Sequence, residues 1–176
     1  MPSTTFTLEA GLRKMKNSIG KVNALLNGNA DDLSCWTILL ALKQLESERI
    51  AHIRLLGEYR KCHANTHWTV KNVLENIDCW MHNIGVQIAR LLEYLIHQLQ
   101  NHKTTVTLAL RLQLNRLCTE TRMMLDVEEN VLYPMLDIAN ICTKTISVQS
   151  QTGVDHVLTP ACHDPGLCRP VALKAQ

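Results

Sequence analysis

Residues 70–95 read VKNVLENIDCWMHNIGVQIARLLEYL, with an apolar side chain at every third or fourth position and no polar interruption. The apolar positions are Val70, Leu74, Ile77, Met81, Ile84, Ile88, Leu91 and Leu95. An α-helix turns once every 3.6 residues, so this spacing places all of them on one face. We therefore expect a helix over about 67–100 whose apolar face packs against other helices.

Three more segments of the first 140 residues have comparable apolar spacing, at about 7–26, 31–61 and 105–140. Short clusters of turn-forming residues separate the segments. Short connections between long helices favour antiparallel neighbours. The sequence therefore predicts an all-α fold over residues 1–140, an up-down-up-down four-helix bundle.

Residues 105–114, TVTLALRLQL, alternate between polar and apolar side chains as a β-strand would. No second alternating segment exists to pair with them, and a lone strand would leave its backbone groups without partners. Leu, Ala, Arg and Gln also favour helices. We therefore expect this stretch to be helical.

The periodic pattern stops near residue 141, and residues 141–176 contain three prolines. We expect an irregular C-terminal tail that is flexible or loosely docked. His156, Cys162, His163 and Cys168 in this tail are of zinc-ligand types, but their order matches no common zinc motif. A tail with free thiols is favoured over a zinc site.

The bulk composition favours a single domain that binds neither nucleic acid nor membranes. The 18 basic and 16 acidic residues of the 176-residue chain nearly cancel, and no apolar run is long enough to span a bilayer. No export signal is visible, and the seven widely spaced cysteines favour reduced thiols over a disulfide framework. We expect a cytoplasmic protein.

A few polar side chains interrupt the apolar faces of the second and fourth predicted helices. They are Arg49, His52, Thr121 and Glu128. Burying an unpaired charge is costly, so interior charges are expected to pair. We predict an Arg49–Glu128 contact with His52 nearby, and a structural polar core formed by Arg49, Thr121 and Glu128.

Residues 124–134, MLDVEENVLYP, resemble the last helix of hemerythrin-like (HHE) domains, which reads His-x-x-x-Glu-(Glu/Asn)-x-x-Leu-(Phe/Tyr)-Pro. Glu128, Leu132, Tyr133 and Pro134 match that pattern. Residues 46–56, ESERIAHIRLL, more weakly resemble the family's Glu-His-x-x-Ile helix. The resemblance implies a bundle in which inward histidines and glutamates hold two irons.

Two departures from the family pattern imply a degenerate metal site. Met124 stands where the family has a histidine, and Arg49 stands where the weaker match would place another. Glu128 and His52 are then the remaining candidates for metal ligands. Iron is the cofactor that the resemblance implies, but the missing histidines favour the absence of an intact di-iron centre.

Two functions follow from these patterns. The first is a regulatory, sensing or stress-related binding protein built on the degenerate hemerythrin-like site. The alternative is a metal-free adaptor or anti-sigma-like regulator that binds another protein, with a homodimer as a further option. Residues 78–82, DCWMH, resemble an Asp-x-Trp-Leu-His phrase of the regulator-of-sigma-D family. No catalytic motif is present, which argues against an enzyme.

The three tryptophans, Trp36, Trp68 and Trp80, have two possible roles. We expect them to fill contacts between helices. Their large apolar area would equally suit a surface that binds a partner.

Overall fold

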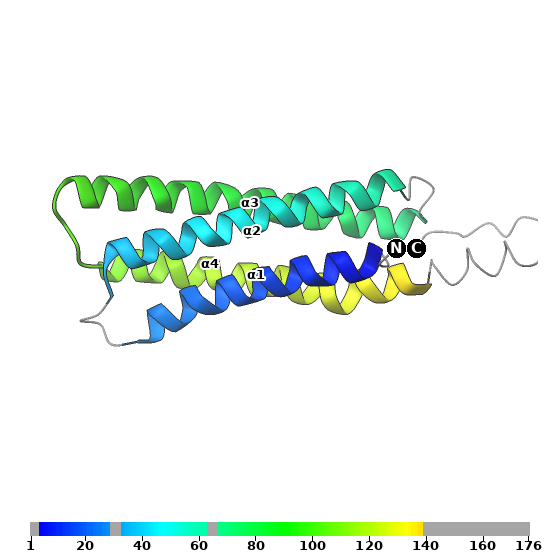
Figure 1. Ribbon diagram of the computed structural model, residues 1–176, viewed down its shortest axis with the longest axis horizontal. Helices are drawn as coiled ribbons and strands as arrows, with labels where there is room; N and C mark the ends of the chain where they lie inside the picture. The colour runs from blue at the N-terminus through cyan, green and yellow to red at the C-terminus, as the bar shows by residue number, and fades with distance from the viewer. Residues whose placement is uncertain (1–3, 29–32, 63–66, 139–176) are drawn as a thin grey trace, which may run out of the picture.

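The computed structural model describes residues 4–28, 33–62 and 67–138, and these form long helices that lie alongside one another (Figure 1). Their bounds are α1 Thr4–Asn27, α2 Cys35–Cys62, α3 Trp68–Gln100 and α4 Leu108–Val127. A single turn of π-helix, η2 (Glu128–Leu132), continues α4, and helical backbone resumes over 133–138. The predicted bundle is confirmed, whereas the predicted tail lies outside the described residues.

The helices pack in the order in which they occur along the chain. α1 contacts α2, α2 contacts α3, α3 contacts α4, and α4 closes the bundle against α1. Successive helices run in opposite directions, which gives the up-down-up-down topology (Figure 1). Among the described helices, none combines the length and apolarity needed to cross a bilayer.

The connection from α3 to α4 shows which part of the alternating stretch at residues 105–114 is helical. Thr105 forms an isolated antiparallel bridge with Ser34, and the backbone N–H of Cys35 donates to the carbonyl of Thr104 at 2.8 Å. The helix starts at Leu108, where the Thr107 hydroxyl accepts from the backbone N–H of Leu110. The helical prediction is therefore right from residue 108 and wrong for residues 105–107, of which Thr105 pairs with Ser34 and Thr107 caps the helix.

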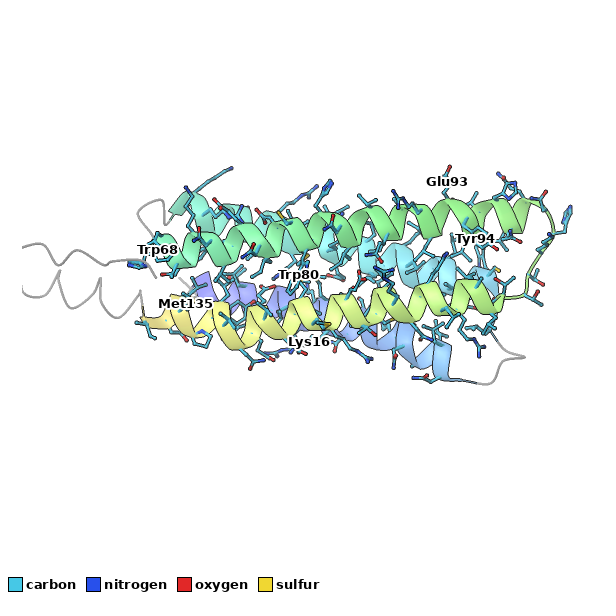
Figure 2. All side chains as sticks on the ribbon, turned by 180° about the vertical axis from the view of Figure 1, so that it is seen from behind. Lys16, Trp68, Trp80, Glu93, Tyr94 and Met135 are labelled. Atoms are coloured by element: carbon cyan, nitrogen blue, oxygen red, sulfur yellow. The ribbon has the colours of Figure 1, made fainter. Side chains whose placement is uncertain are left out.

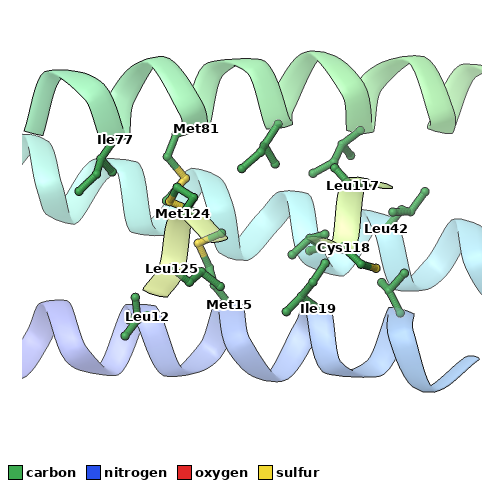
Figure 3. Close-up of a cluster of buried hydrophobic side chains, with 14 of the residues drawn as sticks. Leu12, Met15, Ile19, Leu42, Ile77, Met81, Leu117, Cys118, Met124 and Leu125 are labelled. Atoms are coloured by element: carbon green, nitrogen blue, oxygen red, sulfur yellow. The ribbon is translucent and has the colours of Figure 1, made fainter. Parts of the chain in front are cut away.

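The core follows the predicted apolar faces closely in α1 and α3. All of the α3 positions predicted to face inward are buried. The α1 face is buried over its whole length, at Leu8, Leu12, Met15, Ile19, Val22 and Leu26. Near the middle of the bundle, Met15, Met81 and Met124 point toward one another from α1, α3 and α4 (Figure 3). Flexible thioether side chains fill such irregular interior spaces well.

The predicted face of the fourth helix fails after Glu128. Val131 and Ile138 were expected inside but are 40% and 62% exposed, while Leu132 and Leu136 are buried. The cause is the π-turn, in which the N–H of Tyr133 donates to the carbonyl of Glu128, five residues back. Pro134 follows directly and has no N–H for a regular helical bond. The extra residue in this turn moves the inward face by one position.

Candidate functional site

A cluster of three hydrogen-bonded polar side chains is buried between α2 and the end of α4. The Nε2 atom of His52 lies 2.6 Å from Oε1 of Glu128, and the hydroxyl of Tyr133 donates to the same oxygen at 2.9 Å. His52 and Glu128 have no exposed surface. Two donors on one carboxylate oxygen compensate part of the cost of burying this acid.

The π-turn is what brings Tyr133 to Glu128. In a regular helix, residues five positions apart do not share a face, whereas a π-turn bonds residue i to residue i+5 and places them over each other. The Tyr133 hydroxyl thereby reaches the Glu128 side chain from the next turn of the same helix. The local distortion of α4 thus supplies one of the two donors that this acid needs.

Gly11 of α1 provides the space for the imidazole. A Cβ atom added at Gly11 would lie 2.5 Å from Nδ1 of His52. Because glycine has no side chain, α1 can approach the ring closely there. Nδ1 of His52 and Oε2 of Glu128 have no hydrogen-bond partner among the described atoms, so the cluster is only partly satisfied.

Burial and the neighbouring carboxylate keep Tyr133 in its neutral form. Desolvation is the larger cause of its raised pKa, and the charge of Glu128 adds to it. A neutral phenol can donate its proton in the hydrogen bond, whereas a phenolate could only accept. The cluster therefore holds Tyr133 as a donor throughout the physiological pH range.

Arg49 does not belong to this cluster, and the predicted Arg49–Glu128 contact is wrong. Its guanidinium binds both carboxylate oxygens of Glu46, at 2.6 and 2.7 Å, and donates to the carbonyl of Met81 at 2.9 Å. A Cβ at Gly85 would lie 2.6 Å from the guanidinium carbon, so a second glycine makes room for this side chain. A carboxylate one turn away on the same helix satisfies Arg49 without help from α4.

Thr121 is buried as predicted, but it has no role in the polar cluster. Its hydroxyl donates to the carbonyl of Leu117 at 2.7 Å, one turn earlier in α4. A buried threonine commonly satisfies its hydroxyl in this way. Of the predicted polar residues, the structure brings only His52 and Glu128 into direct contact.

The donor set does not fit the two irons that the hemerythrin resemblance implies. In the described parts of the chain, no group of three or more His, Cys, Asp or Glu side chains is placed to hold a metal. His52 and Glu128 bind each other, and the neighbouring interior positions carry the thioethers of Met15, Met81 and Met124. Thioethers suit soft ions such as Cu(I) and are poor ligands for hard ferric iron.

A groove with a volume of about 970 Å³ lies between α3 and α4. Figure 2 shows Trp80 and Tyr94 extending from α3 toward α4 along this groove. Apolar residues from both helices form much of the lining. They are Trp80, Ile84, Val86, Leu91, Tyr94, Ala109, Leu110 and Met123.

The tryptophans lie at the surface, contrary to the first of their two predicted roles. Trp36 is 57% exposed, Trp68 is 65% exposed and Trp80 is 40% exposed. Of these three, only Trp80 lines the groove, together with the half-exposed Tyr94 and Met123. A large aromatic residue at the edge of an apolar groove is typical of a surface that binds a partner.

Of the three charged side chains that line the groove, two are paired with each other. The carboxylate of Glu120 accepts from Arg116 at 2.7 Å and from the side-chain amide of Gln87. The bond from Arg116 is the largest cause of the lowered pKa of Glu120. Arg90 also lines the groove, and no carboxylate of the described residues pairs with it.

Two features of the candidate site, Tyr133 and the groove, were not predicted from the sequence. Tyr133 stands in the quoted segment, and the proline that follows it was the available sign that the helix is irregular there. The sequence indicates the groove more weakly. Trp80 and Tyr94 are large apolar residues that lie beside the inward face of α3 without belonging to it. Periodicity identifies the inward face but not the gap between two neighbouring helices.

Comparisons of the chain with protein-family models, with curated proteins and with solved structures found no match.

Proposed function

We propose that this chain is a metal-free helical adaptor, a regulatory protein that binds a helix of a partner protein in the α3–α4 groove. The observation that carries the proposal is the groove itself, with its apolar floor and the half-exposed Trp80, Tyr94 and Met123 along it. Amphipathic helices bind in such grooves by inserting the side chains of one face.

The dimensions of the groove fit a helical segment. Trp80 and Tyr94 lie fourteen positions apart on α3, which corresponds to roughly 21 Å at a rise of 1.5 Å per residue. A partner helix of about four turns spans that length. The groove volume of about 970 Å³ exceeds what one or two side chains fill, so several anchors along one face can enter it.

Position-specific photo-crosslinking in the native host tests this proposal. A photoreactive phenylalanine analogue replaces Tyr94 or Met123 in the groove, and a control replaces Ile50, which is exposed on α2. We expect one protein to crosslink from the groove positions and not from residue 50. Binding of that purified protein should then weaken at least tenfold when Trp80 and Tyr94 are both changed to Ala.

Two results would contradict the proposal. One is crosslinking of equal strength and pattern at residues 50 and 94. The other is a purified partner whose affinity is unchanged by the Trp80→Ala/Tyr94→Ala variant.

The iron-sensing function implied by the hemerythrin resemblance rests on the buried His52–Glu128 pair alone. Metal analysis of protein isolated from its host, combined with visible absorption spectra, tests it directly. About two irons per chain and an oxo-bridge band, both lost in His52→Leu, would support this second function over the adaptor. Iron content that does not respond to that substitution would reject it.

A further inference from the structure

We infer that the helix bound in the α3–α4 groove is acidic, with a carboxylate that pairs with Arg90. This inference rests on the proposed function, because it describes the occupant of the same groove. The shared chemistry is a helical peptide with one apolar face and Asp or Glu beside that face.

Charge pairing within the groove isolates one cation. Three charged residues line it, Arg90, Arg116 and Glu120, which leaves a net charge of +1. Glu120 is occupied by Arg116 and Gln87, and its lowered pKa keeps it ionised at neutral pH. Arg90 has no such partner in the described part of the chain, so an added carboxylate meets a free guanidinium there.

The position of Arg90 defines where the acidic residue must lie. Arg90 is four positions before Tyr94 on α3, which places it one helical turn from the aromatic side chain. A partner helix with an apolar anchor against Tyr94 would therefore need its carboxylate about one turn from that anchor. A guanidinium binds a carboxylate through two parallel hydrogen bonds, which also fixes the register of the two helices.

The same charge argues against a second copy of this chain as the occupant. A symmetric pair buries the same patch from both subunits, so two linings of net charge +1 would face each other. Like charges brought together in an interface are unfavourable. A partner of opposite charge meets no such repulsion.

A single-tryptophan version of the full chain provides the assay. Trp36→Phe and Trp68→Phe change two exposed residues outside the groove and leave Trp80 as the only tryptophan. The probes are three designed four-turn helical peptides with the same leucine face and either Glu, Gln or Lys beside it. Binding is followed by Trp80 fluorescence at low and high salt, and self-association by sedimentation.

We expect the Glu peptide to bind about tenfold more tightly than the Gln peptide, with the difference shrinking at high salt. Arg90→Glu should reverse the preference, so that the Lys peptide binds best. Arg122→Glu is the matched control, because Arg122 is exposed on α4 and does not line the groove; it should leave the order unchanged.

Failure of the inference and failure of the proposed function give different results. Equal affinity for the Glu and Gln peptides would overturn the acidic helix and leave the groove as a helix-binding site. Absence of binding by all three peptides would overturn both. Self-association that is abolished by Tyr94→Ala would also overturn the inference, because a second copy would then be the occupant.

Discussion

The sequences of α3 and of the last turns of α4 have equally regular apolar spacing. Only in α3 are the buried residues the ones that this spacing predicts. Every inward position predicted for α3 is buried. In α4 the predicted inward positions are correct as far as Glu128. Beyond it, where the π-turn begins, the buried positions are displaced by one residue. The difference teaches that apolar spacing locates a buried face only while the backbone hydrogen bonds keep a regular period.

The two regions also accommodate their polar side chains differently. Beside α3, Arg49 lies at the edge of the core, where the flexible side chain of Glu46 partners it. At the end of α4, the imidazole of His52 and the carboxylate of Glu128 are wholly enclosed. The first arrangement can move toward solvent, whereas the second cannot, and substitutions should separate them.

The largest loss of stability is expected from His52→Leu. This change removes the imidazole donor and leaves Glu128 buried with Tyr133 alone. Removing one partner of a buried pair that contains an acid costs about 3–5 kcal/mol. Chemical denaturation at neutral pH measures the change in the free energy of unfolding.

An all-apolar replacement of the cluster sharpens this test. The variant His52→Leu/Glu128→Met/Tyr133→Phe leaves no orphaned polar group, so its stability should lie within about 1 kcal/mol of the wild type or above it. If the triple variant were as unstable as His52→Leu alone, packing and not the unpaired carboxylate would explain the loss.

The next largest loss of stability is expected at one of two neighbouring residues of the π-turn and not at the other. Leu132→Ala should cost about 2–5 kcal/mol, because Leu132 is fully buried. Val131→Ala should cost only about 0.5 kcal/mol, because its side chain faces solvent. Thermal and urea unfolding of both variants compares the two losses of stability directly. A larger loss for Val131→Ala than for Leu132→Ala would support the regular helix that the apolar spacing predicted.

Gly11 of α1 lies against His52, and Gly85 of α3 lies against Arg49, so substitutions at these glycines also compare the two polar groups. Gly11→Ala should destabilise the fold by about 1–3 kcal/mol, because the new methyl group meets an imidazole that is held in place. Gly85→Ala meets the movable end of Arg49 and should change the stability by less than about 1 kcal/mol.

Gly20→Ala is the matched control for both, because a Cβ there has no neighbour within 4 Å. It should raise the stability by about 0.5–1 kcal/mol through helix propensity alone. Equal effects at residues 11 and 20 would show that α1 does not press on His52.

A further effect is expected only at alkaline pH. Burial raises the pKa of the Cys118 thiol to about 11, from 9.0 for an unperturbed thiol. Between these values the unfolded chain loses the proton while the folded chain keeps it, so stability falls as the pH rises from about 9 to 11. Cys118→Ala should flatten that decline in unfolding curves under reducing conditions, whereas Cys79→Ala, at an exposed thiol, should not.

The sequence was sufficient for the bundle and for part of the polar core, for identifiable reasons. Helix order and the burial of α1 and α3 follow from local periodicity, and His52 and Glu128 stood out because they interrupt it. The predicted Arg49–Glu128 pairing was wrong because Glu46, one turn from Arg49 on the same helix, already supplies the carboxylate that pairs with it. Tyr133 could not be placed without the π-turn, and the groove depends on the spacing of two helices, which no single helix encodes.

The π-turn also sets which side of residues 133–138 faces the interior of the bundle. One additional residue in a helix rotates everything beyond it by about 100° around the helix axis. Ile138 therefore faces the solvent, whereas an uninterrupted helix would have turned it toward the interior of the bundle. Deletion of Asn130, the residue between Glu129 and Val131, would reset this angle and turn the side chains of residues 133–138 to a different side of the helix.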